Sequence, residues 1–72
     1  MDFKKILEQS IKLGVHHNLN ELYGAYAIDA LVLKKPEMED KLKEFTKMAE
    51  EAMKKYEVTG EMLLSEVLEK IS

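Results

Sequence analysis

The chain has 72 residues, no cysteine and a formal net charge of −3, from 14 acidic and 11 basic side chains. This length is below the usual domain size of about 100–150 residues, so we expect one small domain over residues 1–72. The lack of cysteine excludes disulfides, thiolate zinc sites and thiol catalysis. Because every one of the basic residues is lysine and the balance is acidic, nucleic acid is not an expected partner.

Composition favours a folded helical protein: 46% of the residues are hydrophobic, 35% are charged, and there are three glycines and one proline. The start of the chain lacks the apolar segment of a signal peptide. The longest mostly apolar stretch, Leu22 to Leu33, is shorter than the roughly 20 residues that cross a bilayer. We therefore expect a cytoplasmic protein without a membrane partner.

The first predicted helix spans residues 2–13. Asp2 is a suitable N-cap, and Gly14 stands where a left-handed C-cap ends a helix. Its apolar positions fall within one broad stripe: Phe3, Ile6, Leu7, Ile11 and Leu13.

The second predicted helix spans residues 19–34, with Asn18 or Asn20 as its N-cap and Pro36 beyond its end. It is apolar nearly all round. Its main face carries Leu19, Leu22, Tyr23, Tyr26, Ala30 and Leu33, and its other side carries Ala25, Ile28, Leu31 and Val32. Such a helix belongs either at the centre of a bundle or at a subunit interface, and Gly24 beside Ala25 would let another helix approach closely.

The third predicted helix spans residues 37–56, with Pro36 at its start. Its apolar residues are spaced alternately by four and three positions, which is typical of antiparallel bundles and coiled coils. This seam consists of Met38, Leu42, Phe45, Ala49, Ala52 and Tyr56. We expect it to pack against a partner helix.

A fourth predicted helix spans residues 60–71, with Thr59 as its N-cap. One face carries Leu63, Leu64, Val67, Leu68 and Ile71. Together the four segments predict an all-α fold, a compact bundle of three to four short helices in antiparallel hairpins with no β-sheet.

The only two imidazoles, His16 and His17, are adjacent, and His17 has Glu21 four residues further along. These three residues are candidate metal ligands, but a metal centre needs three or four converging groups and adjacent histidines point apart. The alternative is that both are exposed loop residues near the negative end of the first helix.

Asp29 is the one acid within a long apolar run. It is a candidate buried acid, and buried carboxylates concentrate at functional sites. Because it lies between the two apolar faces of its helix, it could instead reach water or a lysine from another helix.

Motifs for catalysis are missing from the sequence: no glycine-rich phosphate loop and no nucleophile elbow is present. A helix-turn-helix reader is disfavoured, because the exposed face of residues 60–71 carries three acids and the single Lys70. We expect no enzymatic activity, no cofactor and no small-molecule substrate.

The sequence predicts a small non-enzymatic protein-interaction module that self-associates, as a dimer, through apolar faces of the second and third helices. The interface is predicted at Ala25, Ile28, Leu31 and Val32, with another protein as the other possible partner. One alternative is a regulatory protein that binds a basic partner or a nucleic-acid-associated protein through its acidic surface. A second alternative is a metal-binding protein that uses the His16–His17 region.

Overall fold

The computed structural model describes residues 2–72 and contains four α-helices and one π-helix. These are α1 (Phe3–Leu13), α2 (Leu19–Ala27), the π-helix η1 (Ile28–Val32), α3 (Pro36–Tyr56) and α4 (Leu64–Ile71). No strand occurs in residues 2–72, where the only β pairing is an isolated bridge between Asn18 and Leu63. The predicted all-α class is confirmed.

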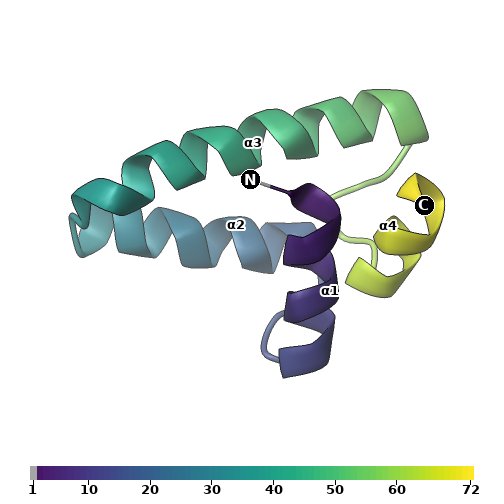
Figure 1. The fold of residues 1–72 in the computed structure, drawn as a ribbon, viewed down its shortest axis with the longest axis horizontal. Helices are drawn as coiled ribbons and strands as arrows, with labels where there is room; N and C mark the ends of the chain where they lie inside the picture. Colours follow the sequence, from purple (N-terminus) through teal and green to yellow (C-terminus); the bar gives the residue numbers. More distant parts are fainter. Residues whose placement is uncertain (1) are drawn as a thin grey trace.

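The helices pack as two pairs (Figure 1). The first pair is an antiparallel hairpin, in which α2 and η1 run beside α3. The second pair consists of α1 and α4, and α1 stands across the hairpin near its middle. One end of the hairpin, where η1 turns into α3, therefore extends beyond the other two helices.

The helix ends follow local sequence signals. The Asp2 side chain accepts a hydrogen bond from the Lys5 N–H at 3.3 Å, and the Asn18 side chain accepts one from the Glu21 N–H at 2.9 Å. Gly14 has a φ of 69° and its N–H donates to the Ser10 carbonyl. The caps predicted at Asp2 and Gly14 are confirmed, and Asn18 rather than Asn20 caps α2.

Phe45 of α3 lies at the centre of the core, with no exposed surface. Its ring centroid lies 5.9 Å from that of Phe3 and 5.0 Å from that of Tyr26, so α1, α2 and α3 meet at this side chain. The buried core consists of Leu7, Leu19, Leu22, Phe45, Ala49, Ala52, Val58, Leu64 and Val67. The middle of the predicted α3 seam is thus covered within the chain.

The second helix is not one α-helix over 19–34. It changes to a π-helix at Ile28, and the Leu33 N–H donates to the Ile28 carbonyl at 2.9 Å. Pro36 lacks an N–H and disfavours helical backbone in the residue before it, so the helix ends before Lys35, whose backbone is extended. The chain closes through a wider turn, with Lys34 at a positive φ of 52°.

The fourth helix begins at Leu64 rather than at 60, and Thr59 is not its N-cap. The Gly60 carbonyl accepts a hydrogen bond from the Asn20 N–H at 3.1 Å, and the Leu64 N–H donates to the His17 carbonyl at 2.8 Å. These two bonds hold the segment against the start of α2, and it forms a single turn, in which the Met62 N–H donates to the Thr59 carbonyl at 3.3 Å, before α4 begins.

Candidate interaction surface

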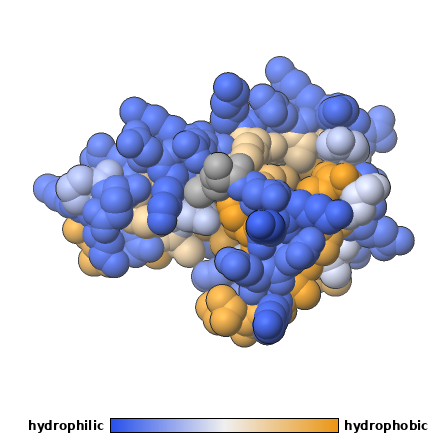
Figure 2. All heavy atoms as spheres, in the orientation of Figure 1, coloured by the Kyte–Doolittle hydropathy of each residue, from blue (hydrophilic) through white to orange (hydrophobic). Residues whose placement is uncertain are grey.

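The protruding end of the hairpin carries a cluster of exposed apolar side chains, which we call the η1 patch. It consists of Ile28, Leu31, Val32 and Leu33, of which 53%, 63%, 68% and 55% are exposed. Figure 2 shows apolar atoms at the end of the molecule where η1 lies in Figure 1. Isolated exposed apolar residues are common on protein surfaces, but four in one short segment are not.

Three of the four predicted interface residues, Ile28, Leu31 and Val32, belong to this patch, and Ala25 is half-buried in α2. The sequence places Leu33 on the main apolar face of the second helix, but the side chain is exposed, because the π-turn changes the angle at which the following residues leave the helix. Pro36, three residues further along, is the sequence signal that indicates an irregular end of this helix. Tyr23, which shares that face, is 44% exposed.

Asp29 is not a buried acid. Its side chain is 37% exposed and lies 3.9 Å from the ammonium group of Lys35. The alternative, a carboxylate at the helix edge that reaches water and a lysine, describes its position. The rim of the η1 patch therefore carries both signs of charge, with Lys34 also exposed.

Next to the hairpin end is a hollow of about 580 Å³, bounded by α1, α2 and the start of α3. Its apolar lining comes from Ile6, Tyr26 and Met38, and its charged lining from Glu37, Asp40, Lys41 and Glu44. We call it the acid-rimmed hollow. Burial raises the pKa of the Tyr26 hydroxyl above its ordinary value of 10.0. The sequence does not predict this hollow, because its lining combines residues of three helices.

The candidate metal ligands are only partly brought together. The His17 Nδ1 atom lies 3.4 Å from a Glu21 carboxylate oxygen, which gives one side-chain pair rather than a site. His16 instead lines a hollow of about 140 Å³ between the end of α1 and the start of α4, to which His17 also contributes. Within residues 2–72, no group of three or more His, Cys, Asp or Glu side chains is placed to hold a metal ion.

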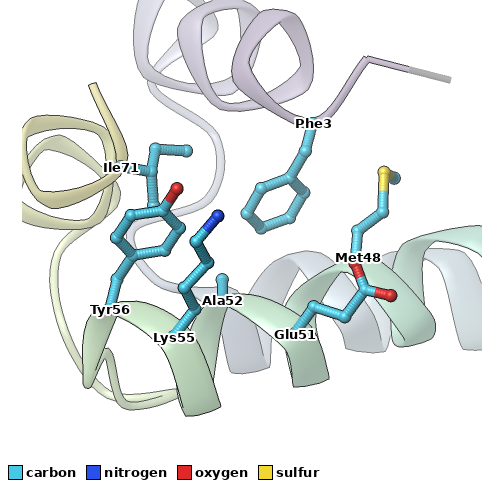
Figure 3. Close-up of a pocket in the computed structure, with 7 residues that line it drawn as sticks. All are labelled: Phe3, Met48, Glu51, Ala52, Lys55, Tyr56 and Ile71. Carbon is cyan, nitrogen blue, oxygen red and sulfur yellow. The ribbon is translucent and has the colours of Figure 1, made fainter.

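A further depression lies where α1, α3 and α4 meet and measures about 260 Å³ (Figure 3). Phe3, Ala52 and Ile71 provide apolar surface, and the Lys55 ammonium group lies 5.4 Å from the centre of the Tyr56 ring. Its lining includes no histidine, serine or cysteine. The depression thus lacks a nucleophile paired with a histidine base.

A second exposed apolar cluster surrounds the C-terminal end of α1. Leu13 and Val15 are 75% and 63% exposed, and Leu63 is half-exposed. Figure 2 shows apolar atoms at this end of α1, away from the η1 patch. The two clusters therefore provide matched positions for mutagenesis.

No protein-family model, curated protein sequence or solved structure matches the chain. Within residues 2–72, none of the helices combines the length and apolar character that a membrane span requires.

Proposed function

We propose that the protein is a small non-enzymatic interaction module that self-associates as a dimer through the η1 patch. The observation that carries the proposal is the grouping of four large apolar side chains, each more than half exposed, at one end of the hairpin. Contiguous apolar surfaces of this kind on small proteins usually mark interaction sites. Because the middle of the α3 seam is buried within the chain, we place the interface on the second helix alone.

A second copy is the occupant that we favour, because the rim of the η1 patch carries charges of both signs. An interface with two-fold symmetry places the same residues on both sides, so such a rim can pair its acidic residues with the basic residues of the other copy. Around the η1 patch, Asp29 and Glu37 lie close in sequence to Lys34 and Lys35. A two-fold axis through the patch would therefore bring both signs of charge together from each copy.

The area that a dimer interface buries is a small part of the surface of this chain. A specific interface buries about 800 Å² on each partner, roughly a sixth of this chain's 5024 Å² of accessible surface. The four patch residues supply the apolar centre of such an area, and the polar residues around them supply the rim.

Two matched substitutions test the proposal: Ile28→Lys in the η1 patch and Leu13→Lys in the other exposed apolar cluster. Sedimentation equilibrium should show a dimer for the native chain and for Leu13→Lys. It should show at least about tenfold weaker association for Ile28→Lys, because a lysine would be buried at the contact. Circular dichroism checks that both variants stay folded. Dissociation by Leu13→Lys alone would place the interface at the end of α1 and contradict the proposal.

A further inference from the structure

The depression where α1, α3 and α4 meet combines apolar walls with a cation that faces inward. Its apolar lining consists of Phe3, Met48, Ala52 and Ile71, of which only Ala52 is fully buried. Figure 3 shows the Lys55 ammonium group between the rings of Phe3 and Tyr56. Concave sites with mostly apolar walls and a few converging polar groups are typical of small-molecule binding.

The Lys55 ammonium group is not neutralised by a carboxylate. Glu51 lies four residues earlier on α3, in the order and at the spacing that favour a glutamate–lysine pair. The ammonium group instead lies 5.4 Å from the centre of the Tyr56 ring, and Figure 3 shows the Glu51 side chain directed away from it. Among residues 2–72, no carboxylate lies within ion-pair distance of this group. Its charge is therefore available to an anion from outside the chain.

A second hydrogen-bond donor lies on the same side of the depression. Figure 3 shows the Tyr56 hydroxyl directed toward the space that the Lys55 ammonium group enters. A carboxylate has two oxygens that can accept hydrogen bonds from two such donors, and bonds to a charged group are the stronger ones. These two donors therefore favour a carboxylate as the polar end of a ligand.

The apolar walls define the other end of the ligand. The depression measures about 260 Å³, and an apolar cavity of about 150 Å³ is sufficient for benzene. One aromatic ring with a short acid group therefore fits the available volume. The Phe3 ring provides an aromatic surface against which such a ring can pack.

We infer that this depression binds a small aromatic carboxylate. The carboxylate accepts hydrogen bonds from the Lys55 ammonium group and the Tyr56 hydroxyl. The ring of the ligand packs against Phe3 and Ile71. The depression lies toward the end of α3 opposite the η1 patch (Figure 1), so the inference does not rest on the proposed self-association.

Phenylacetate is the probe that tests the inference. Isothermal titration calorimetry should show saturable binding to the native chain, and the amide chemical shifts that change should be those around the depression. The ligand should also raise the midpoint of thermal unfolding, because it binds the folded chain. Acetate lacks the ring, and 2-phenylethylamine replaces the carboxylate with a cation, so both should bind at least about tenfold more weakly. Equal binding of either compound would overturn the inference.

Lys55→Met and Lys54→Met are the matched variants. Methionine keeps much of the apolar length of lysine and removes the charge, and Lys54 is an exposed neighbour that does not line the depression. Lys55→Met should bind phenylacetate at least about tenfold more weakly, and Lys54→Met should bind it as the native chain does. Circular dichroism checks that both variants stay folded.

The outcome is independent of the η1 patch. Ile28→Lys should bind phenylacetate as tightly as the native chain, and Lys55→Met should leave the association in sedimentation equilibrium unchanged. Absence of phenylacetate binding to the native chain, or equal weakening by Lys55→Met and Lys54→Met, would contradict the ligand site and leave the proposed self-association standing.

Discussion

The backbone N–H of Asn20 donates a hydrogen bond to the Gly60 carbonyl at 3.1 Å, and the Asn20 side chain occupies the space that a Cβ on residue 60 would need. This contact joins the first turn of α2 to the segment before α4. It connects the two helix pairs through residues that are far apart in sequence. A larger residue at position 60 would therefore force the exposed Asn20 side chain to move.

Replacing Gly60 with alanine should destabilise the protein only slightly. The added methyl group overlaps the end of the exposed Asn20 side chain, which can rotate away from it. We therefore expect the free energy of unfolding to fall by at most about 1 kcal/mol, below the cost of an overpacked core. Urea unfolding followed by circular dichroism measures it. A loss of more than about 2 kcal/mol would show that the Asn20 side chain is held in place.

Gly24→Ala is the matched substitution and should have the opposite effect on stability. Gly24 lies inside α2, and a Cβ there would meet no atom within 4 Å. Alanine is favoured over glycine in a helix interior by about 0.5–1 kcal/mol. The free energy of unfolding, measured in the Ile28→Lys background so that association does not contribute, should rise by that amount. A loss of stability there would show that the position is not open.

Phe45→Ala should remove most of the stability of the fold. Its fully buried ring contacts Phe3 and Tyr26, so truncation opens a cavity where three helices meet. Such substitutions cost about 3–5 kcal/mol, close to the whole stability of many small domains. The thermal transition should become broad or disappear. Met53→Ala, at a partly exposed position of the same helix, should keep a sharp transition.

Stability should fall at alkaline pH through Tyr26. Burial raises its pKa in the folded protein above 10.0, the value expected in the unfolded chain. The protonated hydroxyl is therefore favoured by folding, and its contribution is complete below about pH 10 and is lost as the pH rises through the folded-state pKa. Tyr26→Phe removes this titration. The unfolding free energy of the native chain minus that of the variant should decrease from about pH 9 to about pH 11. A constant difference would contradict the shift.

Local signals were sufficient for much of the fold. Helical periodicity identified Leu7, Leu22 and Phe45 as core residues, and the caps at Asp2 and Gly14 depend on neighbouring residues alone. These features depend on interactions within a few positions of the chain, which a single sequence displays directly.

Features that depend on contacts between distant segments were missed. The start of α4 at Leu64 is set by the hydrogen bond to His17, and no signal near residue 64 reveals that bond. The exposure of Leu33 follows from the π-turn, whose geometry a regular helical wheel cannot represent. The acid-rimmed hollow combines residues of three helices and becomes visible only once α1 is placed across the hairpin.

Association of two copies is the step on which the proposed function depends. Sedimentation equilibrium of the native protein over about a hundredfold range of concentration measures it, because a dimer dissociates on dilution by mass action. We predict a mass near twice 8.3 kDa at the highest concentration, which falls toward 8.3 kDa on dilution. A mass of 8.3 kDa at every concentration would contradict self-association.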